Sequence, residues 1–439
     1  MGKLISRILS LFLGYGLSEK DRILIVTGMK KSVFVQVLTY GLVFINSYLL
    51  VRTAGVNDYG LYVNVFNWLG LFSVFACFGM EDVVLAKIPK NLSAGKYRET
   101  ISLILKVNRM IFFFSILGVL SFVVFFYNHF FKEKFLLIIS ALNIYFLSFI
   151  VVNQQVLQAF DKFYLSQVTD KIFKPLLMSL IVFPFFIYGK MANASTLIIC
   201  NTIVLFASCI IVFFLLKNIV KAIAGDEKET GPGIKISRDS LYFFFISILY
   251  LLNSRIGILI LGAVGDNRSV GILNILSRFA DLVLLPYLLI HIVVPQLFSR
   301  HADSDRLYRR RLFFQSTRLI TICGGIMLVV MILAGRFLLR FYDPVLEQFY
   351  PSLILLCVGQ FLFSLFGPCS AILMMQGEQK TTALILFFNV FLDAILYYVF
   401  IQFYGLEGAI WATFATSIIY NIGMRLLVKK HLSLDPKIS

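Results

Sequence analysis

The sequence is dominated by about twelve apolar stretches, each close to the roughly 20 residues that a helix needs to cross about 30 Å of hydrocarbon. Hydrophobic residues make up 59% of the chain, and the mean hydropathy is +0.88. Helices of soluble domains keep a polar face, so soluble domains do not repeat such stretches. Backbone polar groups inside a bilayer must be satisfied within their own segment, which favours helices. The predicted fold class is an all-α polytopic membrane protein with about twelve transmembrane helices.

The predicted spans group into two halves of six helices. The spans are residues 32–51, 60–86, 107–127, 135–160, 172–189, 194–216, 241–263, 270–298, 312–335, 348–376, 382–403 and 407–428. The predicted segments are a cytoplasmic or interfacial N-terminal segment 1–31, an N-terminal half 32–216, a cytoplasmic linker 217–240, a C-terminal half 241–428 and a cytoplasmic tail 429–439. None of the connecting loops is long enough to hold a separate soluble domain.

The distribution of lysine and arginine predicts the orientation of the spans. Most of the 40 lysines and arginines lie on one side, in the N-terminal segment, in the tail and in the stretches around 87–106, 161–174, 217–240, 299–311 and 377–381. The opposite loops hold Arg52, Lys132, Lys134, Lys190, Arg268, Arg336 and Arg340. Positive residues concentrate on the cytoplasmic side of membrane proteins. Both termini are therefore expected in the cytoplasm, and the net charge of +17 does not call for nucleic-acid binding.

Short polar matches between the two halves indicate an internal duplication. They occur in the same order, at offsets between 207 and 218 residues. Ile45–Tyr48 matches Leu252–Arg255, and Arg109 matches Arg318. Asn64, Asn67 and Trp68 match Asn274, Ser277 and Arg278 in that order, and Gln158–Lys162 matches Gln376–Lys380. Both halves enter the membrane from the same side. They are therefore expected to be related by a pseudo-two-fold axis along the membrane normal, with a substrate site between them.

Polar and charged residues inside the spans of the C-terminal half predict a cationic lumen. The eighth span carries four polar residues at i, i+3, i+4 and i+7, which share one helix face: Asn274, Ser277, Arg278 and Asp281. Asn253 and Arg255 lie in the seventh span, where Arg255 reaches a depth similar to that of Arg278. The alternatives are an internal Arg278–Asp281 salt bridge and an Arg255 side chain that extends outward to the interface.

The corresponding positions of the N-terminal half predict an aromatic and amide wall. Where the second half has Arg255 and Arg278, the first has Tyr48 and Trp68, and Asn64 and Asn67 lie beside them. Such a wall would suit a cargo with sugar rings, although ordinary helix packing explains Trp68 equally well.

Further charged residues predict an entrance and ion coupling. Arg109 and Arg318 lie near the cytoplasmic boundary, where they guide an anion inward or simply extend to the interface. Asp393, the pair Glu81 and Asp82 near the inner end of the second span, and Asp281 if it is not paired with Arg278 are candidates for ion coupling, with structural pairing as the alternative. The chain lacks a Walker A loop, HExxH or GxSxG motif in a fitting context, which predicts a protein that is not an enzyme and has no cofactor or metal.

The chain resembles the polysaccharide flippases of the Wzx type, which share a superfamily, MOP, with the lipid II flippases and the MATE antiporters. Nearly the whole chain takes part in the resemblance, which is carried by residues 51–55, 58–62, 78–80, 261–262, 270–271, 294–295 and 405–409. The family commonly has an acidic residue beside the position where this chain has Asn253, Ser254 and Arg255.

This resemblance implies flipping of undecaprenyl-diphosphate-linked oligosaccharides across the bacterial inner membrane by alternating access, for O-antigen or a related surface polysaccharide. The expected partners are this lipid-linked oligosaccharide, the lipid bilayer, a polysaccharide polymerase and a chain-length regulator, with no nucleic acid. A MATE-like antiporter of small organic solutes is the alternative. A membrane-embedded glycosyltransferase would need a sizeable external loop, and the predicted outer loops are short.

Overall fold

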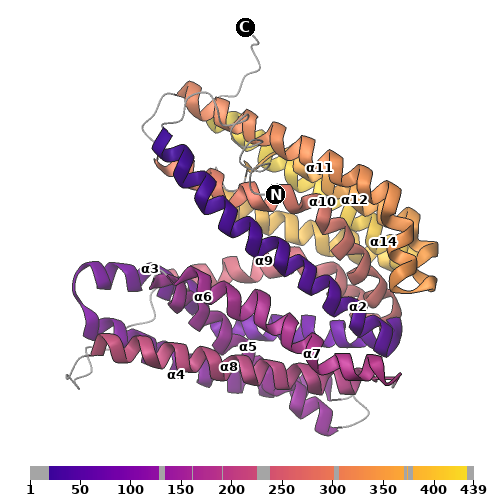
Figure 1. Cartoon of the computed structure of the whole chain (residues 1–439), viewed down its shortest axis with the longest axis horizontal. Helices are drawn as coiled ribbons and strands as arrows, with labels where there is room; N and C mark the ends of the chain where they lie inside the picture. Colours follow the sequence, from indigo (N-terminus) through magenta and orange to yellow (C-terminus); the bar gives the residue numbers. More distant parts are fainter. Residues whose placement is uncertain are drawn as a thin grey trace. The chain divides into compact units, whose positions relative to one another are not determined.

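The structure is a computed structural model that describes residues 19–127, 134–160, 162–189, 191–224, 238–300, 306–369, 373 and 379–432. These residues form helices and short connections without a β-strand, which confirms the all-α fold class (Figure 1). The chain forms two compact units. We call Gly41–Arg255 the N-terminal unit, and Met1–Tyr40 together with Ile256–Ser439 the C-terminal unit.

The N-terminal unit is a bundle of long helices around α5. It contains the later part of α2 (Glu19–Cys77), then α3 (Met80–Ser93), α4 (Tyr97–Phe126), α5 (Lys134–Ala159), α6 (Phe163–Gln167), the π-helix η1 (Val168–Phe173), α7 (Lys174–Ile187), α8 (Ala194–Ala224) and the first part of α9 (Arg238–Ala263). Helix α5 packs against α3, α4 and α8. The cores that these contacts bury include Val152, Val156, Ala141 and Ile144 from α5.

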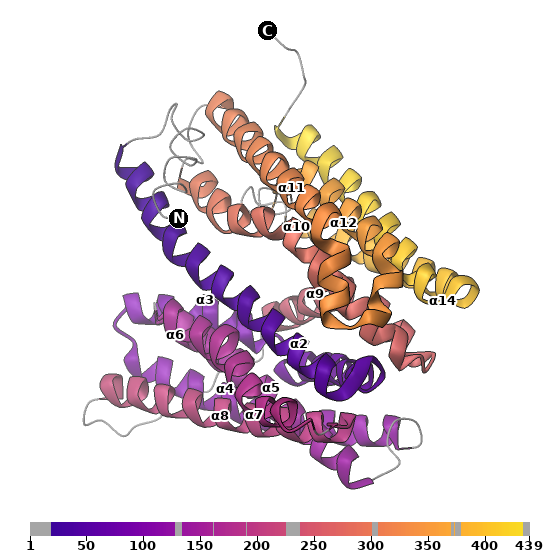
Figure 2. The ribbon, with the colours of Figure 1, turned by 45° about the vertical axis from the view of Figure 1, so that its right-hand side comes forward.

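The C-terminal unit is a second helical bundle, in which α12 is central. It contains the first part of α2, the end of α9, α10 (Asn267–Arg300), α11 (Arg306–Tyr342), the 3-10 helix η2 (Pro344–Phe349), α12 (Tyr350–Leu365) and α14 (Gln379–Leu432). Helix α12 packs against α10, α11 and α14, and these helices run side by side in Figure 2. Leu353, Leu356 and Cys357 of α12 are buried.

The chain is a multi-pass membrane protein, because nine of its described helical stretches are long and apolar enough to cross a bilayer. Two of them, Val35–Cys77 and Lys380–Leu426, are long enough for two spans each. Each holds one glycine with non-helical backbone angles, Gly55 at φ 77° and Gly405 at φ 56°. These breaks separate the first predicted span from the second and the eleventh from the twelfth. The helices also expose large apolar side chains such as Val124, Leu333 and Phe403, as lipid-facing helices do.

Two predicted spans are interrupted. The second, 60–86, breaks at Phe78 and Gly79, whose φ angles are 49° and 68°. The tenth, 348–376, ends as a continuous helix at Leu365, since Gly367 has φ 73° and Pro368 disfavours a helical residue before it. Each interruption includes a glycine, which adopts a positive φ angle readily. A hydropathy profile does not detect such a backbone conformation.

The fifth predicted span, 172–189, belongs to a longer run. Helix α6, η1 and α7 follow one another without a gap from residue 163 to residue 187. Lys174, which the charge pattern assigns to a cytoplasmic stretch, lies near the middle of this run.

The two compact units have boundaries different from those of the two predicted halves. The chain passes from one unit to the other within α2, after Tyr40, and within α9, after Arg255. The predicted halves, 32–216 and 241–428, describe a duplication in the sequence, which stays a prediction. Helix α2 begins at Glu19, inside the segment 1–31 predicted as interfacial. The rest of that segment, residues 225–237 of the predicted linker and residues 433–439 of the tail lie outside the described residues.

Candidate functional site

In the C-terminal unit, the predicted polar face of the eighth span lies on α10. Because α10 is one helix, Asn274, Ser277, Arg278 and Asp281 share a face. Asn274 is 6% exposed, and the other three side chains are half-buried. The Asp281 carboxyl group acts electrostatically on Tyr40 of α2 and on Cys357 of α12. This face therefore points toward neighbouring helices of its own unit, where polar groups meet within an apolar bundle.

Arg255 lies on α9 and belongs to the N-terminal unit. It is exposed, as is Ser254, whose hydroxyl donates to the Leu251 carbonyl at 2.9 Å, while Asn253 is half-buried. Arg255 is the last residue of the N-terminal unit, and Ile256 begins the C-terminal unit. A lumen that combines Arg255 with Arg278 of the other unit stays a prediction.

The four predicted site residues of the N-terminal half lie on α2. The ring of Tyr48 lies 5.7 Å from the Arg52 guanidinium and 6.2 Å from the Phe186 ring. Asn64 is fully buried, and Asn67 donates its amide to the Val63 carbonyl at 2.7 Å. Asn67 is therefore bound to the backbone of α2, and the Tyr48 ring lies beside α7.

Trp68 is engaged in packing between α2 and α4. Its ring lies 5.9 Å from that of Phe125 and 5.3 Å from that of Phe126. Its indole nitrogen is buried without a hydrogen-bond partner among the described residues. The contacts therefore account for Trp68 as a packing residue, and the predicted aromatic wall facing a cargo stays a prediction.

The two predicted entrance residues lie on the surfaces of their units. Arg109 on α4 and Arg318 on α11 are both exposed. Their helices begin well before the predicted spans, α4 at Tyr97 and α11 at Arg306, so both arginines lie within long continuous helices.

Asp393 lies in a buried polar cluster of the C-terminal unit. It is 3% exposed, near the middle of the first span of α14, and its Oδ2 accepts a hydrogen bond from the Asn389 amide at 3.0 Å. Its Oδ1 has no hydrogen-bond donor in the part of the chain that the structure describes. Thr416 and Tyr397 lie beside the carboxyl group, and both interact with it. This arrangement suits a neutral carboxyl group better than a carboxylate, which needs a cation or several donors.

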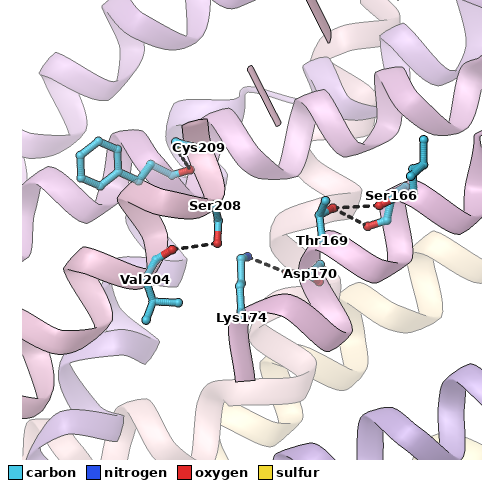
Figure 3. Close-up of polar contacts among 9 residues, drawn as sticks. Ser166, Thr169, Asp170, Lys174, Val204, Ser208 and Cys209 are labelled. Atoms are coloured by element: carbon cyan, nitrogen blue, oxygen red, sulfur yellow. Dashed lines mark hydrogen bonds and ion pairs between the residues drawn. The ribbon is translucent and has the colours of Figure 1, made fainter. Parts of the chain in front are cut away.

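A further intramembrane acid, which was not singled out from the sequence, is Asp170 of η1. Lys174 forms an ion pair with it, Nζ to Oδ1, at 2.6 Å, and the two side chains are one helical turn apart (Figure 3). Lys174 also acts electrostatically on Cys209 of α8. Thr169 beside the pair donates to the carbonyls of Leu165 and Ser166, and Ser208 donates to that of Val204. The i, i+4 spacing of acid and lysine is the sequence signal that could have revealed the pair.

Comparison with known proteins shows the fold. No family model matches the chain, and no curated protein matches it. An inward-facing multidrug-resistance MATE family transporter of the MOP superfamily matches with a TM-score of 0.70 and 14% identity, over 90% of this chain and 94% of that one. An outward-facing MATE family transporter matches with a TM-score of 0.64 and 14% identity, over 93% and 95% of the two chains.

A MOP superfamily transporter from Pyrococcus furiosus, described as having a binding pocket of reverse polarity that suggests a different function, also matches. Its TM-score is 0.63 at 15% identity, over 97% of this chain and 98% of that one. The likeness covers nearly the whole length of every chain compared. This chain therefore has the fold of the MATE transporters of the MOP superfamily.

Proposed function

We propose that this chain translocates undecaprenyl-diphosphate-linked oligosaccharides across the bacterial inner membrane by alternating access. The observation that carries the proposal is the half-buried Arg278, which shares a face of α10 with Asn274 and Ser277 inside an apolar bundle. An intramembrane arginine costs at least about 2.5 kcal/mol, so it is retained where an anion or a polar cavity needs it. The fold supports alternating access, because MATE transporters are known in inward-facing and outward-facing conformations.

The chemistry of a lipid diphosphate fits these side chains. A guanidinium group binds phosphate oxygens through paired hydrogen bonds, and Arg278 and Arg255 are the candidates for this contact. Asn274 and Ser277 can donate to and accept from sugar hydroxyls. The polyprenyl chain of such a cargo would stay in the bilayer, beside the apolar surface that the helices expose.

The first experiment measures on which side of the inner membrane the lipid-linked oligosaccharide accumulates, in cells with and without the gene. Deletion is expected to trap the oligosaccharide on the cytoplasmic face, and the intact gene is expected to reverse this. An unchanged distribution with normal surface polymer would contradict the proposal.

Substitution of the α10 arginine tests the site itself. Arg278→Ala is expected to reduce surface polymer at least tenfold, the effect of losing about 1.4 kcal/mol of cargo binding, without loss of protein from the membrane. Arg278→Lys keeps the charge but not the paired hydrogen bonds, so it is expected to be intermediate. Arg268→Ala, at an exposed position near the start of the same helix, is the matched control and should leave the polymer unchanged. A normal amount of surface polymer in Arg278→Ala would show that this residue does not contribute to the site.

An ion-coupled antiporter of small organic solutes is the second candidate, and the fold is the observation that favours it. The discriminating measurement is solute efflux from the same cells. Increased retention of an organic cation after deletion, together with normal surface polymer, would favour the antiporter. The intramembrane arginines count against a cationic cargo because they would repel it.

A further inference from the structure

We propose that Arg336 and Arg340 of the C-terminal unit bind the head-group phosphate of an anionic phospholipid. The proposal does not depend on which cargo the chain transports. Both arginines lie in the last two turns of α11, and their side chains are each 72% exposed. At about 1.5 Å per residue, they lie roughly 9 and 3 Å from the helix end at Tyr342. This position in a membrane span is close to the level of lipid head groups.

The charge pattern distinguishes this pair from the other basic residues of the chain. Few of the 40 lysines and arginines lie on the predicted outer side, and Arg336 and Arg340 are two of them. They are four residues apart on one helix, so their side chains are neighbours. The positive-inside rule explains basic residues on the cytoplasmic side only. A basic pair on the opposite side therefore calls for another reason, and an anionic ligand supplies one.

One carboxylate, that of Glu347 in η2, is shared by both guanidinium groups. Arg336 donates its Nε hydrogen to Glu347 Oε1 at 2.7 Å, and the Nε of Arg340 lies 4.0 Å from Oε2. No second acid forms an ion pair with either arginine within the described part of the chain. The three side chains together therefore keep one positive charge, which the single negative charge of a phosphodiester neutralises. Because Glu347 contacts the Nε atoms, the terminal amino groups can donate to phosphate oxygens.

The chain around Glu347 holds this carboxylate in place. The side chain of Asp343 caps η2 by accepting a hydrogen bond from a backbone amide at 2.9 Å, and Leu346 of the same helix is fully buried. Directly after η2, Tyr350 donates its hydroxyl to the Ile332 carbonyl of α11 at 2.7 Å. Glu347 is itself only 28% exposed. The carboxylate thus orients the guanidinium groups before a ligand arrives, which lowers the entropic cost of binding.

The apolar surface beside the arginines suits acyl chains. Among the nine candidate spans of the described residues, the one in α11 has the smallest buried share, as expected for a helix that faces lipid. Leu333, Phe337 and Phe341 are exposed and alternate with the two arginines along the helix. A phospholipid places a phosphate next to acyl chains, and this surface places guanidinium groups next to apolar side chains. A phospholipid therefore complements the surface better than a free anion does.

Lipid binding to the purified full chain in detergent tests the proposal. Native mass spectrometry compares phosphatidylglycerol, which is anionic, with phosphatidylcholine, which is zwitterionic, and the parent is expected to prefer the former. Arg336→Gln and Arg340→Gln should each weaken phosphatidylglycerol binding about fivefold, the usual effect of one basic residue near anionic lipid. Binding of phosphatidylcholine should not change. Arg268→Gln, at an exposed position on the same predicted side, is the matched control and should bind as the parent does.

Two further measurements test the role of charge and of the acyl chains. Glu347→Gln keeps an oxygen for Arg336 but removes the competing negative charge, so phosphatidylglycerol binding is expected to strengthen about twofold or more. Glycerophosphate, which has the head-group phosphate without acyl chains, should compete poorly. Effective competition would assign the arginines to a free anion and overturn the lipid assignment. Parental binding of phosphatidylglycerol by the double variant, Arg336→Gln with Arg340→Gln, would overturn the site itself, since both side chains are exposed and their replacement should leave the fold intact.

Discussion

Asp170 in the N-terminal unit and Asp393 in the C-terminal unit are both acids within helices of a membrane protein, but their surroundings differ. Asp170 has its own cation, Lys174, at 2.6 Å. Asp393 has the Asn389 amide at 3.0 Å and an oxygen without a donor among the described residues. The first site is electrically neutral as an ion pair, whereas no described residue forms an ion pair with the second. The ion pair gives Asp170 a structural role, and ion coupling at Asp393 stays a prediction.

Two pairs of polar side chains connect helices of the N-terminal unit. Asn108 and Asn153 exchange two hydrogen bonds, of 2.7 and 3.1 Å, between α4 and α5. Asn143 of α5 donates to Thr202 of α8 at 2.9 Å. Since α5 is the central helix of this unit, these bonds fix its register against both neighbours.

The largest expected effect is that of Lys174→Met, which leaves Asp170 charged inside the bundle. We expect a loss of roughly 2 kcal/mol of stability, less than the ~3–5 kcal/mol of a fully buried pair, since the Asp170 side chain is 43% exposed. The measurement is unfolding of the purified chain in detergent. The double variant with Asp170→Asn should recover most of the loss, because no uncompensated charge remains. Equal stability of Lys174→Met and the parent would mean that the pair is not structural.

Most spans and one polar helix face were predictable from the sequence alone. The shared face of Asn274, Ser277, Arg278 and Asp281 was predictable because helical periodicity is local and α10 is uninterrupted. The positions of most spans were predictable from apolar length alone. The helix breaks at Gly79 and Gly367 were not predictable, because a hydropathy profile carries no information on the backbone φ angle.

The surroundings of individual side chains in the folded bundle were not predictable from the sequence. Lys174 looked cytoplasmic because the charge rule treats a lysine at the edge of an apolar window as part of a loop. Asp393 was recognised as a candidate, but its contact with Thr416 depends on how two spans fold together at Gly405. Trp68 could not be assigned from its position on α2, because its packing depends on Phe125 and Phe126 of α4.

A smaller effect is expected from breaking one amide pair of the N-terminal unit. Asn153→Ala removes both bonds to Asn108 and leaves the Asn108 side chain with its bond to the Ile104 carbonyl at 2.9 Å. We expect a loss of about 1–2 kcal/mol, because a polar group is left partly unsatisfied. Unfolding in detergent measures it. The double variant Asn108→Ala with Asn153→Ala should lose less than the sum of the two single variants, and simple additivity would show that the pair is not coupled.

The smallest effect on stability is expected at the unpaired acid. Asp393→Asn replaces a carboxyl group by an amide of nearly the same shape, and the neutral acid and the amide make similar demands on the surrounding spans. We expect a change within about 1 kcal/mol. Asp170→Asn, by contrast, removes a charge-assisted hydrogen bond and is expected to cost about 1.5 kcal/mol, the low end for such bonds, because the Asp170 side chain is 43% exposed. Unfolding of both variants in detergent near neutral pH gives the comparison directly. If Asp393→Asn is the more destabilising of the two, the carboxyl group is ionised and satisfied in the folded chain. The roles assigned to the two acids would then be reversed.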